Sequence, residues 1–199
     1  MKRENILYAV VALLVGLLGG FLIFSISGQK GQPSVNAGIP AGGGAPIDYQ
    51  QRIAEAEKIV AREPGNLQAW VQLGNDYFDT DQPQKAINAY GKALELDPNN
   101  PNILTDQGIM YKRVGQFDRA VANFEKAQQI DPKHVQSLYN LGVVYMDDLK
   151  QPDKAIKAWN RYLELEPTSP NAQQIRGLIE QAKGLQQMKG GASAPLFRK

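Results

Sequence analysis

The chain has 199 residues, with 22 Lys and Arg against 20 Asp and Glu, a formal net charge of +2 and one histidine. This near-balance argues against a dedicated nucleic-acid-binding protein, which usually presents a strongly basic face. The absence of cysteine excludes disulfides, thiol catalysis, Cys-ligated metals and an acylated lipoprotein anchor, and a single histidine excludes a multi-histidine metal site.

The first predicted element is a membrane helix over residues 6–26, within an N-terminal segment of residues 1–26. These 21 residues carry no charge, and fourteen of them are Leu, Ile, Val or Phe. As a helix they would extend roughly 31 Å, about the thickness of a bilayer's hydrocarbon core. The run exceeds the about 7–15 apolar residues of a cleaved signal peptide, so an uncleaved signal anchor is favoured. Ser25-Ile26-Ser27 would nevertheless suit a signal peptidase.

Charges beside this run predict its orientation. Lys2 and Arg3 precede it, and only Lys30 follows closely. The positive-inside rule then places the N-terminus in the cytoplasm and the rest of the chain on the other side of a single-pass membrane protein. Gly16 and Gly20 form a GxxxG pair through which such helices can dimerise, although glycine is common in membrane helices anyway.

A linker is predicted over residues 27–47. Eleven of these 21 residues are Gly, Pro or Ser. Such a composition cannot bury a core and behaves as a flexible tether, with a mean span of roughly 25 Å. We therefore expect the folded part of the chain, residues 48–188, to remain close to the membrane surface.

Residues 67–169 repeat with a period near 34 residues, which divides them into units of 67–100, 101–134 and 135–169. Six kinds of position recur in all three units, at spacings of 34 or 35 residues. The recurring sets are Trp70, Leu104 and Leu138; Gly74, Gly108 and Gly142; Tyr77, Tyr111 and Tyr145; Ala86, Ala120 and Ala155; Tyr90, Phe124 and Trp159; and Pro98, Pro132 and Pro167.

These positions suit pairs of antiparallel helices. The recurring glycines and alanines allow close approach of a neighbouring helix, the aromatic residues fill the space between helices, and each proline ends a second helix. The third unit has one extra residue. The predicted helices cover residues 67–80, 83–96, 101–114, 117–130, 135–148 and 152–165.

Single helices are predicted to flank the three units. Residues 48–66 show apolar residues at helical spacing and end in a Pro-Gly break, as a half-repeat helix would. Residues 170–188 form another amphipathic pattern, which would cover the apolar face of the last unit. Residues 189–199 are predicted to be a disordered tail.

The 34-residue pattern resembles the tetratricopeptide repeat (TPR). The resemblance implies an all-α TPR superhelix, an α-solenoid of three antiparallel helix pairs with flanking helices, behind the membrane helix. It also implies that the first helices of successive repeats line a concave groove that holds an extended peptide or a helix. The expected function is therefore a membrane-tethered protein–protein interaction scaffold.

Several groove positions implied by the resemblance are apolar where a solvated face would be polar, which usually marks a binding site. Lys112 and Arg113 are expected to supply charge complementarity to a protein or peptide partner. The alternative is that some of the apolar residues pack between adjacent repeats. The groove prediction comprises Val71, Asn75, Phe78, Asp106, Ile109, Lys112, Arg113, Tyr139, Asn140, Val143 and Met146.

Sequence motifs for catalysis are absent from the chain. There is no nucleophile motif, metal-ligand spacing or phosphate loop, and we expect neither cofactor nor nucleic acid. His134, between two repeats, is expected to be solvated, and Gln107, which departs from a leucine column, to be partly exposed. A non-enzymatic protein is predicted; the rival hypothesis is an enzyme subunit that needs a partner's residues.

The layout of anchor, arm and repeats resembles bacterial membrane-anchored TPR proteins, in particular the periplasmic TPR subunits of cytochrome c maturation. This implies the inner (cytoplasmic) membrane, with the repeats in the periplasm, and an alternative role in presenting apocytochrome to a haem lyase. TPRs that clamp the C-terminal carboxylates of chaperones are a poorer match. Among their positions only Asn75 fits, and Asp106 would repel a carboxylate.

Overall fold

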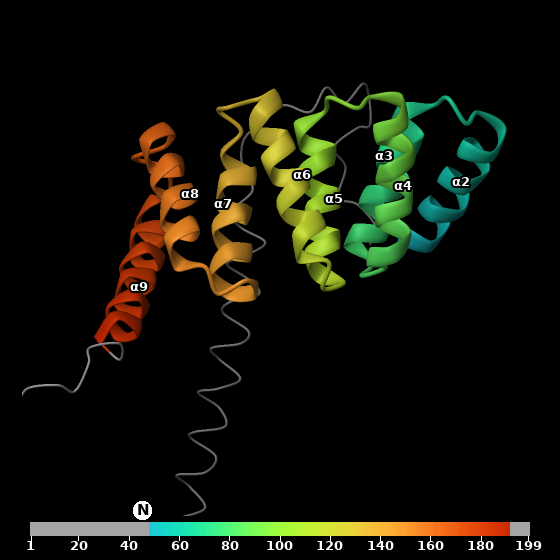
Figure 1. Ribbon diagram of the computed structural model, residues 1–199. Coiled ribbons are helices and arrows are strands. Elements are labelled where there is room, and N and C mark those ends of the chain that lie inside the picture. Colours follow the sequence, from blue (N-terminus) through green and yellow to red (C-terminus); the bar gives the residue numbers. More distant parts are fainter. Residues whose placement is uncertain (1–47, 192–199) are drawn as a thin grey trace, which may run out of the picture. The chain divides into compact units, whose positions relative to one another are not determined.

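The computed structural model describes residues 48–191, with side chains to residue 187 (Figure 1). The predicted membrane helix with its GxxxG pair, the linker and residues 192–199 lie outside the described residues. Within them, no helix is long and apolar enough to cross a membrane. The elements are α2 (Tyr49–Arg62), α3 (Leu67–Asp79), α4 (Pro83–Leu96), α5 (Pro101–Arg113), α6 (Phe117–Ile130), α7 (Val135–Val143), the π-helix η1 (Val144–Asp148), α8 (Pro152–Leu165) and α9 (Ala172–Gly191).

The described residues form a helical solenoid, as predicted. Each helix packs on its neighbour in sequence, and α3–α4, α5–α6 and α7–α8 are the three repeated pairs (Figure 1). Helix α2 covers one end of the row and α9 the other. Helix α9 continues through residues 189–191, which we had expected to belong to the tail.

Capping side chains and prolines stabilise the first turns of several helices. The side-chain oxygens of Asp48, Asn66 and Asn100 accept hydrogen bonds from backbone N–H groups in the first turns of α2, α3 and α5. These bonds satisfy donors that have no partner inside a helix. Prolines occupy the first turn of three helices, where a missing N–H costs nothing. They are Pro83 in α4, Pro101 in α5 and Pro152 in α8.

The turn inside each repeat places one residue in the left-handed region, at the same position of the three units. These residues are Asp81, Gly115 and Lys150, with φ of 55°, 76° and 56°. In the third unit the extra residue is absorbed just before this turn, by the π-helix η1. The helix predicted over residues 135–148 has these bounds in the structure, but its last part, Val144–Asp148, is a π-helix, whose i→i+5 bonds accommodate one residue more than an α turn.

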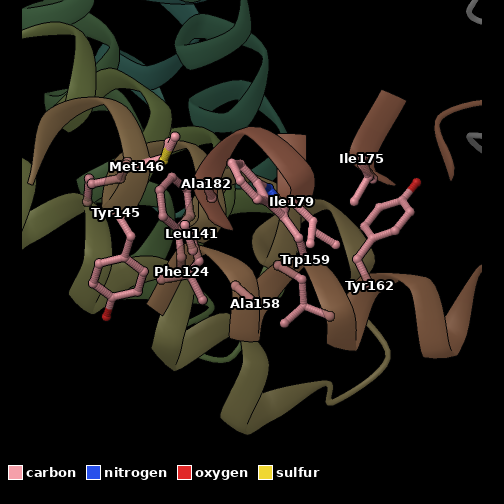
Figure 2. Packing of buried hydrophobic residues seen from close by; sticks show 14 residues of the cluster. Phe124, Leu141, Tyr145, Met146, Ala158, Trp159, Tyr162, Ile175, Ile179 and Ala182 are labelled. Atoms are coloured by element: carbon pink, nitrogen blue, oxygen red, sulfur yellow. The ribbon is translucent and has the colours of Figure 1, made fainter. Parts of the chain in front are cut away.

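The recurring glycines and aromatic residues meet as the repeat pattern predicts. A Cβ added at Gly74 would lie 2.5 Å from Tyr90 Cε1, and one at Gly108 would lie 2.5 Å from Phe124 Cε1. Two buried apolar clusters result, one centred on α3 and α4 and one on α7, α8 and α9. Figure 2 shows the second of these clusters. Ile109 packs against both clusters, so the units share one continuous core.

Gln107 is buried, with 6% of its surface exposed, and the expectation of a partly exposed amide was wrong. Its Nε2 donates to the backbone oxygen of Ile87 at 3.0 Å, and its Oε1 accepts from Asn123 Nδ2 at 2.8 Å. Asn123 Nδ2 also lies 3.3 Å from the backbone oxygen of Leu104. The amide is tolerated inside the solenoid because these hydrogen bonds replace those it would make to water.

Candidate partner-binding surfaces

The predicted groove residues lie on α3, α5 and α7–η1, and we call this surface the groove face. Its apolar members are mostly half-buried. Val71 and Phe78 pack against the N-terminal cluster, and Tyr139 and Val143 against the C-terminal one. The alternative that some of these side chains pack between repeats thus holds in part. Only the exposed part of each of these side chains is available to contact a partner.

Met146 differs from the prediction. It is only 8% exposed and belongs to the C-terminal core cluster (Figure 2). The reason is its place inside η1, where the π turn breaks the regular helical register on which the groove prediction rests. Met146 therefore contributes packing to the core and little surface to a partner.

The two basic residues of the groove face are already paired within the chain. Lys112 Nζ lies 3.4 Å from Asp148 Oδ2, and Arg113 Nη1 lies 2.9 Å from Asp81 Oδ1. The Arg113 guanidinium also lies 5.1 Å from the centroid of the Phe78 ring. Both cations join one repeat to the next, so the charge they present to a partner is largely compensated.

The two asparagines of the groove face also make hydrogen bonds within the chain. Asn75 Oδ1 accepts a hydrogen bond from the Tyr90 hydroxyl at 2.8 Å, and Asn140 Nδ2 donates to the backbone oxygen of Gln136 at 2.9 Å. Asn75 keeps its amide nitrogen free of any partner among residues 48–187. It can still donate to a backbone carbonyl of a bound segment.

Asp106 is the exception on the groove face. It is half-buried near the middle of α5, and among the described residues its carboxylate has neither a hydrogen bond nor an ion pair. Burial raises its pKa to about 6. Burial also raises the pKa of Tyr90, and the nearby carboxylates of Asp106, Asp79 and Asp76 raise it further. The centre of the groove face is therefore acidic.

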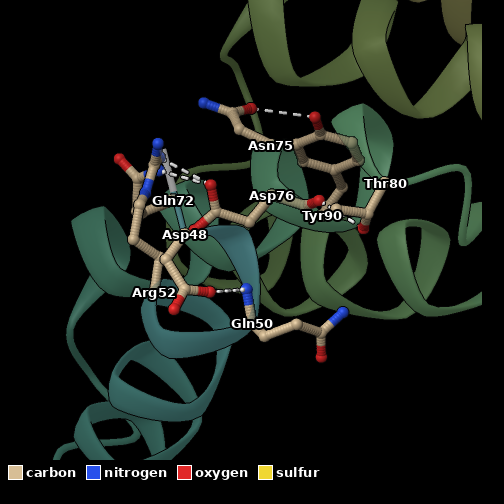
Figure 3. A network of polar contacts seen from close by, with 8 residues as sticks. All are labelled: Asp48, Gln50, Arg52, Gln72, Asn75, Asp76, Thr80 and Tyr90. Carbon is tan, nitrogen blue, oxygen red and sulfur yellow. Dashed lines mark hydrogen bonds and ion pairs between the residues drawn. The ribbon is translucent and has the colours of Figure 1, made fainter. Parts of the chain in front are cut away.

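An ion pair between a buried aspartate and a partly exposed arginine, which sequence reasoning missed, lies at the N-terminal end of this face (Figure 3). Asp76 is fully buried, and its Oδ1 lies 2.5 Å from Arg52 Nη2 and accepts from Gln72 Nε2 at 3.1 Å. Burial raises the pKa of Asp76, while Arg52 and then Gln72 lower it. The pair ties α2 to α3, so the half-repeat helix is held by charge as well as by apolar packing.

His134 is the N-cap residue of α7 and is not simply solvated, as we had expected. Its Nδ1 lies 3.1 Å from Ser137 Oγ, and its Nε2 lies 3.0 Å from Asn102 Oδ1. Burial lowers its pKa, and Asp131 raises it. These contacts join the second and third units. The hydroxyl groups beside the imidazole, those of Ser137 and Thr105, are fully buried and donate to the backbone oxygens of His134 and Pro101. Within residues 48–187 no group of three potential metal ligands gathers.

A large hollow on the described surface lies away from the groove face. It measures about 760 Å³ and is bordered by α2, α4 and α6 with residues of α3 and α5 beneath. Sequence reasoning missed it, because the groove prediction considered only first helices. Its lining includes Tyr77, Lys85, Gly91, Tyr111 and Arg119.

Three tetratricopeptide-repeat family models match the chain, over residues 67–100, 89–122 and 113–179. A solved structure titled as MamA covers 74% of this chain and 92% of its own, with a TM-score of 0.61 and 24% identity. The Sgt2 TPR domain from Aspergillus fumigatus covers 73% of this chain and 88% of its own, with a TM-score of 0.54 and 24% identity. These likenesses show the fold.

Among curated proteins, the human Superkiller complex protein 3 is 32% identical over 62 residues. That match takes in 31% of this chain and 4% of the human protein. The chain therefore spans a small part of the length of this relative, and the likeness concerns the repeats.

Proposed function

Residues 67–179 of this chain consist of tetratricopeptide repeats, and on this premise we propose that the protein is a non-enzymatic scaffold that holds a partner segment on its groove face. Repeats of this family are generally protein–protein interaction modules without catalytic activity. The proposal concerns a peptide or an extended segment of a protein partner.

The observation that carries this proposal is that the Asp106 carboxylate is half-buried without a hydrogen-bond or ion-pair partner among the described residues. A half-buried carboxylate without a charged neighbour carries a cost, because burial removes part of its water and no described side chain replaces the lost hydrogen bonds. A cation from a bound segment would offset part of this cost through a charge-assisted hydrogen bond. We therefore propose that the bound segment carries a Lys or Arg that pairs with Asp106, while Ile109 and Tyr139 contact the apolar part of that segment.

Asp106 also changes the electrostatic part of the sequence prediction. Lys112 and Arg113 were expected to supply charge complementarity to a partner, but both already have carboxylate partners in the chain. Reversing their charges would break these pairs and would confuse a loss of binding with a loss of packing. A basic partner segment agrees better with the uncompensated charge.

Photocrosslinking in cells tests the groove face. We expect a photoreactive residue at Gln136 or Gln68, both exposed on this face, to give a discrete adduct with a partner in the full-length chain. The matched control is Gln129, exposed on α6, which should give none. Asp106→Asn should reduce the groove-face adduct by about tenfold, the value of a charge-assisted hydrogen bond. Strong adducts at Gln129 with none at Gln136 or Gln68 would contradict the proposal.

The identity of the adduct also decides between narrower roles. An apocytochrome or a haem lyase would assign the scaffold to cytochrome c maturation, the alternative suggested by its layout. Another protein would place it in a different pathway with the same mode of binding.

We further propose that the scaffold is tethered to the inner membrane by residues 6–26, with the repeats in the periplasm. The uncharged run and the position of Lys2 and Arg3 support this arrangement. A reporter that is active only outside the cytoplasm, fused after Lys199, should be active and should remain in the membrane fraction. Activity in the cytoplasm, or a soluble product beginning near Gly28, would refute the tether.

A further inference from the structure

A glutamate–tyrosine pair recurs on the side of the second helices. In the first unit the Tyr77 hydroxyl donates to Glu57 Oε1 at 2.5 Å, and in the third the Tyr145 hydroxyl donates to Glu125 Oε1 at 3.0 Å. In both cases the glutamate stands twenty residues before the tyrosine, on the second helix of the preceding unit. The pair therefore links consecutive units in the same way at two places.

A basic side chain completes each of these pairs. Lys85 Nζ lies 5.2 Å from the centroid of the Tyr77 ring, and Lys154 Nζ lies 5.1 Å from that of Tyr145. The solenoid thus repeats a cluster of glutamate, tyrosine and a cation over the ring. Attraction between the cation and the ring face helps to hold this arrangement.

The middle unit keeps two members of the cluster and lacks the third. Arg119 lies over the Tyr111 ring, 5.1 Å from its centroid. The residue twenty positions before Tyr111 is Gly91, which stands 34 residues after Glu57 and 34 before Glu125. Among the described residues the Tyr111 hydroxyl has no hydrogen-bond partner, and Arg119 pairs with no carboxylate.

The space that the missing side chain would fill is open. Gly91, Tyr111 and Arg119 all line the hollow of about 760 Å³. A Cβ at Gly91 would come no closer than 3.5 Å to another side chain, at Gln107 Nε2, so the floor is not crowded. The lining also holds Lys85 and Lys92 together with Glu57 and Glu95, and Lys92 is paired with Glu95, so with Arg119 the hollow carries one positive charge more than negative.

We propose that this hollow receives a glutamate side chain from a protein partner, whose carboxylate accepts a hydrogen bond from the Tyr111 hydroxyl beside Arg119. The occupant is a glutamate because the two complete clusters of the same solenoid hold a glutamate in this place. The site goes beyond the groove-face proposal: it lies on other helices and takes a carboxylate, whereas Asp106 calls for a cation. Either proposal can fail without the other.

Stability measurements on the full-length chain test whether the hollow accepts a carboxylate. Glutamate and glutamine have similar helix propensities and sizes, so Gly91→Glu and Gly91→Gln differ mainly in charge. We expect Gly91→Glu to unfold at a midpoint about 2–4 °C above Gly91→Gln, because only the carboxylate restores the complete cluster. Tyr111→Phe should abolish this difference. Equal midpoints for the two variants would overturn the proposal.

Binding is tested with a blocked glutamate, N-acetyl-glutamate N-methylamide, titrated into the isotopically labelled full-length chain. We expect saturable changes in the NMR signals of Gly91 and of the Arg119 side chain, with the matched glutamine compound binding at least about tenfold more weakly. Gly91→Glu should abolish these changes because the site is then filled, whereas Gly177→Ala on α9 should leave them intact. Equal responses to the two compounds, or responses that persist in Gly91→Glu, would overturn the proposal.

Discussion

Replacing Gly108 with leucine should destabilise the repeat domain by at least about 3 kcal/mol. A Cβ at this position would lie 2.5 Å from Phe124 Cε1 and 2.9 Å from Cδ1. Phe124 is fully buried, so its ring cannot withdraw without disturbing the core. Overpacking of a well-filled core costs about 1–3 kcal/mol or more, and leucine adds three further carbons beyond the Cβ. Urea unfolding followed by helical circular dichroism measures the effect.

Gly177 provides the control for this substitution. It lies on α9, and a Cβ there would meet nothing within 4 Å. Gly177→Leu should therefore be neutral or stabilise by up to about 1 kcal/mol, because glycine is a poor helix former. Combining Gly108→Leu with Phe124→Ala should cost less than the sum of the two single changes, since the smaller side chain makes room. Unchanged unfolding of Gly108→Leu would contradict the packing of the repeats.

The destabilisation by Gly108→Leu should extend beyond the second unit to its neighbours. Each repeat buries its apolar faces against its neighbours, so the stability of a solenoid depends on the interfaces between units. Ile109 follows Gly108 and packs against both apolar clusters. We therefore expect Gly108→Leu to lower protection from hydrogen exchange in α3–α4 as well as in α7–α8.

The repeated pairs could be predicted because their determinants are local and recur. Glycine opposite an aromatic ring, proline at a helix start and an Asn or Asp cap each act within one unit or between neighbours. The helix predicted over residues 135–148 ends at Asp148 as expected, but its π turn could not be predicted, because the spacing shows an extra residue without showing how it is absorbed. Met146 was misplaced for the same reason.

The surface chemistry was harder to predict, because it depends on which charges find partners across helices. The sequence spacing of Lys112 and Asp148 does not predict their ion pair. The ion pair of Arg52 with Asp76 was equally hard to predict, because the two residues lie on different helices. The open place at Gly91 is different. The column of Glu57, Gly91 and Glu125 at 34-residue spacing was visible in the sequence and could have pointed to it.

Asp106→Asn should stabilise the folded chain at neutral pH. Burial raises the pKa of Asp106 from 3.8 to about 6, so the fold favours the protonated form. A shift of this size corresponds to at most about 3 kcal/mol, since one pKa unit is worth about 1.4 kcal/mol. Asparagine has nearly the same shape and carries no charge. We expect a gain of about 1–3 kcal/mol above pH 7.

Because the pKa of Asp106 is raised in the folded chain, the stability difference between the parent and Asp106→Asn depends on pH. Well below pH 3.8 the carboxyl group is protonated in both the folded and the unfolded chain, and Asp106 then carries no penalty. As the pH rises toward and through 6, the unfolded chain ionises first and the folded chain loses stability relative to Asp106→Asn. The difference between parent and variant should therefore appear between about pH 4 and pH 7 and stay constant above.

Unfolding free energies from urea titrations at pH 3.5, 5, 6 and 8 measure this difference, with Asp79→Asn as the matched control. Asp79 is exposed on the same face, and its substitution should change stability by less than about 0.5 kcal/mol at every pH. A binding role adds a second requirement: the more stable Asp106→Asn chain must hold its partner less well in the crosslinking experiment. If Asp106→Asn is no more stable than the parent at pH 8, the argument that Asp106 needs a bound cation fails. If the variant is more stable yet crosslinks as strongly as the parent, this carboxylate has a structural effect and no role in binding.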